Sequence, residues 1–186
     1  MSLQVAKHYF TVEQFERMGE AGIFAEDARL ELIEGEIVEM SPIGSRHAAC
    51  VKRLSMHFSR TLGDKFIIST QDPIHLDDFT QPQPDVALLQ PREDFYESAH
   101  PKPQDVLLLI EVSDTTVDYD RMVKLPLYAK AGIPEVWIID LPAELIEIYS
   151  VPSEGAYGTW AEVKRSEQAR SQTITTLSIP ADMILG

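Results

Sequence analysis

The chain has 186 residues, which is enough for one domain with a sizeable buried core. Its content of 44% apolar and 25% charged residues is ordinary for a globular protein in water. The formal charge of −14 argues against a general nucleic-acid binder, because affinity for phosphate comes from clustered lysine and arginine side chains.

The composition also argues against a membrane protein and against a disulfide scaffold. The longest apolar stretch, residues 106–110, has the length of a strand and not that of a membrane helix. The first residues lack the apolar centre and the cleavage site of a secretory leader. One cysteine, Cys50, excludes an internal disulfide framework and a cysteine-rich zinc site. We therefore expect a cytoplasmic protein.

Residues 1–44 are expected to form a short helix followed by a β-hairpin. The segment Thr11–Gln14 has the pattern of a capping box, which predicts a helix start. Two predicted strands, 29–33 and 36–40, flank Glu34-Gly35, which is a weaker hairpin signal than Asn-Gly or Asp-Gly.

A longer helix is predicted over residues 46–62, ending at Gly63. Its apolar residues recur at intervals of three and four and form one stripe, and His47 belongs to that stripe. The histidine should therefore point toward the sheet from the first turn of the helix.

A second face of this helix carries Arg46, Arg53 and Arg60, which recur every seven residues. Residues 45–65 hold five lysines and arginines and only one acid, so this part of an acidic chain is locally basic. The three arginines are our candidates for contacts with a nucleic-acid backbone. The alternative is an ordinary solvated helix face.

The remaining elements predict an α/β fold. From residue 45 onward the expected order is α, β, β, β, α, β, which gives a mixed sheet with helices packed against it. A late antiparallel strand pair and a short packed tail should follow. We expect a single domain, 1–186, made of an N-terminal helix and hairpin (1–44), a core (45–140) and C-terminal strands (141–186). The later predicted strands are 66–70, 85–90, 107–112, 135–140, 144–151 and 157–165, with a helix before Gly132.

Two carboxylates interrupt segments that otherwise read as buried strands. Asp85 follows Pro84 and opens an apolar run, and Glu111 lies near the end of Val-Leu-Leu-Leu-Ile-Glu-Val-Ser. A buried carboxylate is costly unless it is paired or binds a cation. Together with the backbone carbonyl of Val112, the two acids could hold Mg²⁺ or Mn²⁺, which prefer oxygen ligands. Alternatively, Asp85 caps a turn and Glu111 faces solvent at a strand end.

Lys124 follows these acids, just before an apolar helix-like stretch. A bound cation would polarise a phosphoryl group and lower the pKa of a water, and the lysine would orient that water or stabilise developing charge. Two carboxylates followed by a lysine are what metal-assisted phosphodiester hydrolysis needs. An ordinary surface lysine is the alternative.

This constellation resembles the PD-(D/E)XK restriction-endonuclease-like superfamily, and nearly the whole chain is similar to its bacterial Uma-two family. The resemblance implies a restriction-endonuclease-like fold, cleavage of DNA with a divalent metal, and a role for Asp85 and Glu111 as the metal-binding acids. The segments that carry it are Leu30–Ile37, Arg46-His47, Pro84–Ala87, Ile110–Ser113 and Lys124–Asp140.

One position departs from the superfamily pattern. Ser113 stands where Glu-x-Lys would place a lysine, and Lys124, thirteen residues after Glu111, is the migrated substitute that we expect. Because proline is tolerated in the first turn of a helix, Pro126 predicts a helix that begins near residues 122–123. A longer, kinked helix is the alternative.

His47, Glu31 and Ser113 are second-tier candidates. His47 could be an additional ligand, a phosphate contact or a proton carrier, or simply a hydrogen-bonded histidine at the edge of the core. Glu31 could complete the site or bond to His47, and Ser113 offers only a hydroxyl on the side of the sheet that carries Glu111. Asp120 is predicted to cap a helix.

The resulting hypothesis is a divalent-metal-dependent endodeoxyribonuclease, with DNA as a weakly and locally contacted substrate. Two alternatives are a catalytically weakened module that binds nucleic acid or a partner, and a small-molecule phosphodiesterase with the same metal site. A homodimer is expected, because cutting both strands of a duplex is easiest with two active sites and symmetric dimers are the commonest assembly.

Overall fold

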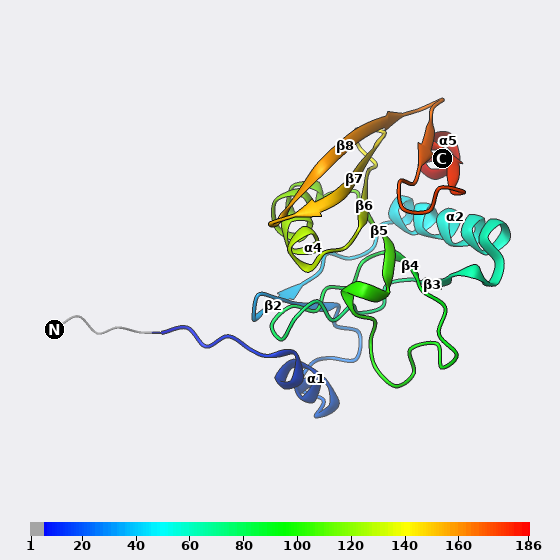
Figure 1. The fold of residues 1–186 in the computed structure, drawn as a ribbon. Helices are drawn as coiled ribbons and strands as arrows, with labels where there is room; N and C mark the ends of the chain where they lie inside the picture. The colour runs from blue at the N-terminus through cyan, green and yellow to red at the C-terminus, as the bar shows by residue number, and fades with distance from the viewer. Residues whose placement is uncertain (1–5) are drawn as a thin grey trace.

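The computed structural model describes residues 6–186 and has a six-stranded mixed sheet at its centre (Figure 1). The strand order is the chain order, β3-β4-β5-β6-β7-β8, and every neighbouring pair is antiparallel except β5 and β6. This confirms the predicted α/β fold with a mixed sheet. The strands are β3 (Ile67–Ser69), β4 (Val86–Leu89), β5 (Val106–Ser113), β6 (Glu135–Asp140), β7 (Leu145–Ser153) and β8 (Ala156–Lys164).

Helices and two small strand pairs complete the architecture. The helical segments are α1 (Val12–Glu20), α2 (Ser45–Leu62), α3 (Val117–Tyr119), α4 (Leu125–Ala131) and α5 (Ala181–Leu185). The order α2, β3, β4, β5, α3–α4, β6 is the predicted α-β-β-β-α-β core, with the expected β7–β8 pair extending the sheet. The small pairs are β1 (Leu30–Ile33) with β2 (Glu36–Glu39), and β9 (Gln168–Arg170) with β10 (Ser178–Pro180).

Helices cover both faces of the sheet. Along β4, Val86 and Leu88 belong to the cluster under α2 and α5, while Ala87 and Leu89 belong to the cluster under α4. This alternation follows from the period of two in a strand, and it explains why every residue of β4 and β6 is buried. Figure 1 shows α2 and α5 side by side.

The predicted start of the helix near residues 122–123 is wrong. The helical segment begins at Val117, and Asp120–Lys124 forms a π-helical turn in which the Leu125 N–H donates to the Asp120 carbonyl. Pro126 has no N–H to donate and disfavours a regular α-turn before it, and a wider turn accommodates this constraint. The longer helix that was the alternative is therefore the one found. Its π-turn buries both Asp120 and Lys124.

The N-terminal hairpin lies beside the connection that leads into β4. Its turn has positive φ at both central residues, Glu34 (48°) and Gly35 (80°), as two-residue hairpins prefer. A Cβ at position 35 would lie 2.6 Å from the Cβ of Tyr9, so only glycine fits there. Leu32 exchanges backbone hydrogen bonds with Gln81, which fixes β1 against the segment before β4.

Across the described residues, 6–186, no helix combines the length and the apolar character that a membrane crossing requires.

The predicted packed tail consists of β10 and α5, with Ile179 and Ile184 fully buried. Predicted and observed strand ends differ by a residue or two, as element ends usually do.

Candidate active site

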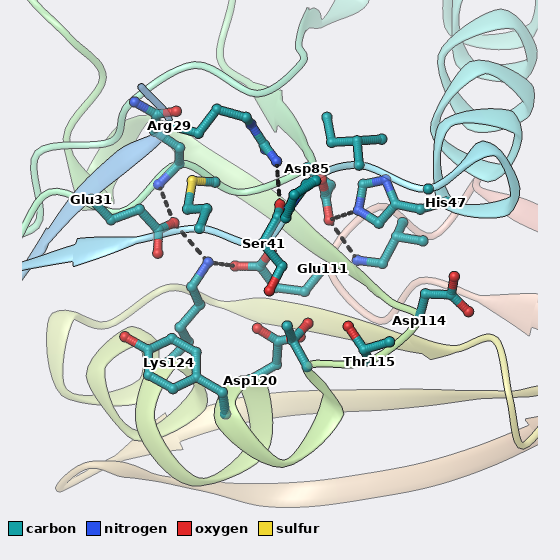
Figure 2. Close-up of a pocket in the computed structure, with 18 residues that line it drawn as sticks. Arg29, Glu31, Ser41, His47, Asp85, Glu111, Asp114, Thr115, Asp120 and Lys124 are labelled. Carbon is teal, nitrogen blue, oxygen red and sulfur yellow. Dashed lines mark hydrogen bonds and ion pairs between the residues drawn. The ribbon is translucent and has the colours of Figure 1, made fainter. Parts of the chain in front are cut away.

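The two predicted carboxylates lie at one end of the sheet, on the same face. Asp85 directly precedes β4, and Val86 pairs with Ile110 in the antiparallel ladder, so Asp85 stands opposite Glu111. Opposite residues of an antiparallel pair project to the same side. Both side chains line a cavity of about 270 Å³, as Figure 2 shows. Their exposed fractions are 7% and 3%, which excludes a solvent-facing Glu111.

Three donors orient the carboxylate of Asp85. Its Oδ2 pairs with Nε2 of His47 at 2.9 Å and accepts a hydrogen bond from the Val112 N–H at 2.9 Å. Its Oδ1 accepts from the side-chain amide of Gln71 at 3.1 Å. His47 reaches the acid from the first turn of α2, as its place in the apolar stripe predicted. The Nδ1 of His47 is buried and has no partner within residues 6–186.

Lys124 lies between two carboxylates and is not a surface lysine. Its Nζ donates to Oε1 of Glu31 at 2.7 Å and to Oε1 of Glu111 at 3.2 Å (Figure 2). Glu31 also accepts the backbone N–H of Gln83 at 2.8 Å, so it links the hairpin to this site. Of the two roles considered for Glu31, the bond to His47 is not the one found, since Glu31 binds Lys124 beside Glu111 instead.

Tyr128 supplies a second donor to Glu111. Its hydroxyl donates to Oε1 of Glu111 from one helical turn beyond Lys124, and the ring is 1% exposed. Burial raises the pKa of Tyr128 well above its ordinary value, and the neighbouring carboxylates raise it further. The phenol therefore keeps its proton and donates a hydrogen bond to the carboxylate.

The site carries more negative than positive charge. Burial raises the pKa of Glu111 well above its ordinary value, Lys124 opposes that rise, and the nearby carboxylates of Asp120, Asp85 and Glu31 add to it. Burial alone would lower the pKa of Lys124, but the surrounding carboxylates raise it above its ordinary value. The pKa values of Glu111 and Lys124 are thus both raised, whereas in an isolated ion pair the pKa of the acid would fall. One ammonium is shared among several acids, so the lysine stays charged while Glu111 resists ionisation.

Ser113 and Asp120 form a separate contact at the edge of the cavity. The hydroxyl of Ser113 donates to Oδ2 of Asp120 at 2.6 Å, and Thr116 donates to the same oxygen at 3.2 Å. Asp120 is not a helix cap, since it lies inside the π-turn and faces the cavity. Burial raises the pKa of Asp120, although Lys124 and the two hydroxyls oppose this rise.

The donor set fits a hard divalent cation. Across residues 6–186, no three acidic, histidine or cysteine side chains form a ready-made metal cage. Magnesium, however, is usually held by one or two carboxylates, with waters and substrate oxygens completing the shell. Oδ1 of Asp85 accepts one hydrogen bond and Oε2 of Glu111 accepts none from described residues, so both oxygens retain lone pairs. The surplus negative charge favours a cation at this place. Val112 contacts Asp85 through its N–H, and the role of its carbonyl stays a prediction.

Of the three arginines predicted to contact nucleic acid, Arg46 and Arg53 donate hydrogen bonds to backbone carbonyls of this chain, and Arg60 is exposed. Arg46 donates to the carbonyl of Leu141 at 2.7 Å, and Arg53 donates to the carbonyl of Ile184 through two nitrogens, at 3.2 and 2.8 Å. These guanidinium groups fasten α2 to the following segments, so we do not carry Arg53 forward as a nucleic-acid contact. Arg60 is exposed.

Sequence reasoning missed the hydroxyl of Tyr128 and the amide of Gln71. The position of Tyr128, four residues after Lys124, could have placed it on the same helix face. Gln71 carries no comparable signal, because its segment lies outside any periodic element. Asp120 is predicted from the sequence only as a cap.

The comparisons with known proteins agree with this fold. A family called Uma2 and described as "Putative restriction endonuclease" matches residues 12–182. The chain belongs to the Uma2 family. It is also similar to a protein from Anabaena variabilis ATCC 29413, described as a "putative nuclease belonging to DUF820", with 15% sequence identity and a TM-score of 0.71. That alignment covers 95% of this chain and 97% of the other, and it supports the fold alone. No curated protein matches the chain.

Proposed function

We propose that this Uma2 protein is a divalent-metal-dependent endodeoxyribonuclease that hydrolyses phosphodiester bonds. One observation carries the proposal: Asp85 and Glu111 are buried on one face at one end of the sheet, and the Lys124 ammonium lies beside Glu111. Buried acids with spare lone pairs beside a cavity are the kind of arrangement that marks a candidate functional site.

Asp85 and Glu111 are the proposed ligands of Mg²⁺ or Mn²⁺. When bound, such a cation supplies a Lewis acid for the phosphoryl group and lowers the pKa of a water. Asp85 is held in place by His47, the Val112 N–H and Gln71, so its carboxylate needs little reorganisation to act.

Lys124 is the proposed residue that stabilises charge on the phosphate or positions the attacking water. An ammonium has three N–H donors, and two of them point to Glu31 and Glu111. The third is available to a substrate oxygen in the cavity. Because the carboxylates raise its pKa, Lys124 is expected to act as a charged donor and not as a base.

The first test is binding of Mn²⁺ and then Mg²⁺ by calorimetry. We expect binding by the wild type and its loss in Asp85→Ala/Glu111→Ala, with Asp64→Asn, an exposed acid after α2, as the matched control. Cleavage of single-stranded and duplex DNA is then measured with the same proteins and with Lys124→Ala. The proposal requires that Lys124→Ala loses turnover while it retains metal binding.

Two results would replace the proposal. Metal binding without cleavage of any DNA form would favour the catalytically weakened binding module. Cleavage that is insensitive to salt and confined to small diesters would favour the phosphodiesterase, because duplex binding depends steeply on ionic strength. The homodimer stays a prediction, which sedimentation of the wild type tests.

A further inference from the structure

A second cavity, of about 710 Å³, adjoins the acidic pocket. Tyr119 lines both cavities, so they share a wall. The hydroxyl of Tyr119 is buried and has no hydrogen-bond partner within residues 6–186. A buried hydroxyl without a partner is costly.

One face of the N-terminal hairpin runs along both cavities. On β1, Glu31 lines the acidic pocket and Ile33 lines the second cavity. On the returning strand, Met40 lines the first cavity, while Val38 and Glu36 line the second. Residues two apart in a strand share a face, so the two cavities are consecutive parts of one surface.

Two aromatic side chains stand at the second cavity with much of their surface exposed. Tyr9 is 49% exposed and Phe79 is 44% exposed. Backbone hydrogen bonds hold both segments to the hairpin turn, because the Gly35 N–H donates to the Phe79 carbonyl at 2.7 Å and the Phe10 N–H donates to the Gly35 carbonyl at 2.9 Å. The aromatic groups are thus presented from a fixed backbone and not from a free loop.

We propose that the second cavity binds an unpaired nucleobase of a single-stranded nucleic acid whose phosphate lies in the acidic pocket. This inference rests on the proposed function and specifies its substrate class. Bases stack on aromatic side chains in single-strand binding proteins, and Tyr9 and Phe79 offer such surfaces. The Tyr119 side chain lines both cavities, on the path that a nucleotide spanning them would follow.

The charge of the second cavity also favours a base over a phosphate. Its wall holds Glu34, Glu36 and Asp77 against Lys130, so a second phosphate would be repelled. A nucleobase is uncharged and carries amino donors that carboxylates can accept. The apolar part of the wall comes from Ile33 and Val38.

A continuous duplex fits this surface poorly, because the basic residues of α2 point elsewhere. Successive helical residues are about 100° apart, so Lys52 and Arg60 each lie about 140° around the helix from His47, which faces the pocket. Arg53 is bound to the C-terminal segment, and Arg46 donates to the carbonyl of Leu141. The basic face of α2 is therefore turned away from the acidic pocket and is poorly placed to follow the backbone of a duplex into it.

The experiment measures binding of a 12-nucleotide DNA strand that contains 2-aminopurine, with Ca²⁺ as the divalent ion. Wild type, Tyr9→Ala and Phe79→Ala are compared, and Phe95→Ala is the matched control, since Phe95 is 75% exposed and lies away from both cavities. Stacking should quench 2-aminopurine in the wild type. Each cavity variant should bind about 5-fold to 150-fold more weakly, and the control should not change.

A second comparison separates failure of this inference from failure of the proposed function. Cleavage of the same strand, alone and as a duplex, is measured with Mg²⁺. Duplex cleavage that matches single-strand cleavage and is unchanged in Phe79→Ala would overturn the base site and leave the nuclease intact. Quenching and weaker binding by both variants without any cleavage would support the base site and remove the nuclease. No binding of the strand by the wild type would overturn the inference.

Discussion

Glu111 and Glu135 are both buried glutamates in neighbouring strands of the sheet, yet their surroundings differ. Glu135 is fully buried, and four donors satisfy it: the Trp137 indole on Oε1, and Ser171, Gln172 and Thr173 on Oε2. Glu111 receives two donors, both on one oxygen, and its second oxygen lies at a cavity.

The comparison separates a buried carboxylate whose partners are complete from one that retains capacity for a further partner. When a buried carboxylate accepts several short hydrogen bonds, these bonds offset most of the free energy lost by removing the group from water. A carboxylate with unused lone pairs and a raised pKa gains from a further cation. A glutamate inside a strand therefore does not identify a functional site by itself. The distinguishing property is whether its carboxylate oxygens still have lone pairs that accept no hydrogen bond.

The sharpest test is Glu111→Gln. Removing one proposed metal ligand should lower cleavage by about 10³-fold, since the cation supplies several kcal/mol of transition-state stabilisation. Stability should be unchanged or higher at pH 7, because the amide removes a poorly compensated charge. Cleavage kinetics and thermal unfolding of the same preparation measure both effects. A variant that cleaves normally would remove Glu111 from the mechanism.

Glu135→Gln should show the opposite pattern. The amide turns an NH₂ group toward one set of donors, so at least one hydrogen bond to a charged group is lost and a donor is left buried. We expect a loss of about 2–4 kcal/mol in the free energy of unfolding. Urea unfolding measures the loss. Activity per folded molecule should stay at the wild-type level, and a large fall would place Glu135 in the site.

The pH dependence of stability sharpens the comparison further. Burial raises the folded pKa of Glu111 above the ordinary value of 4.5, so the folded chain retains a proton that the unfolded chain releases. The contribution of Glu111 to wild-type stability should therefore fall as pH rises from about 4.5 toward that folded pKa, by about 1.4 kcal/mol for each pH unit between the two pKa values. In metal-free buffer, Glu111→Gln should gain on the wild type across this range and match it near pH 4. A constant difference between the two proteins would contradict the raised pKa.

The fold could be predicted largely from local patterns. Apolar runs of strand length and the helical stripe that contains His47 indicated the core order, and the carboxylates inside those runs indicated the candidate site. The start of the helix before Lys124 could not be predicted, because Pro126 is typical of a first turn. The structure instead places it after a π-turn, which has no simple sequence signature.

The hydrogen-bond partners of the candidate site residues were harder to predict from the sequence than the residues themselves. Lys124 bonds to Glu31, 93 residues away, and that contact depends on how the hairpin docks against the segment before β4. Three of the four donors around Glu135 likewise come from distant residues, 171–173. Long-range pairing of this kind follows from packing, and a single sequence does not encode it as a local pattern.

The smallest effects come from removing one hydroxyl donor at each glutamate. Ser171→Ala leaves Glu135 with three donors, and Tyr128→Phe leaves Glu111 with Lys124 alone. Tyr128→Phe should cost about 1 kcal/mol in unfolding experiments, as a buried hydrogen bond does, and Ser171→Ala about 2 kcal/mol, because the Ser171 hydroxyl also accepts the Ile174 N–H at 2.8 Å. Only Tyr128→Phe should change function, lowering metal affinity and cleavage about 10-fold, because residues that orient a ligand tune the metal it binds. Calorimetry with Mn²⁺ separates the two variants. Equal affinities would mean that Tyr128 supports the fold and not the position of Glu111, and the contrast between the two glutamates would then rest on the cavity and the lysine.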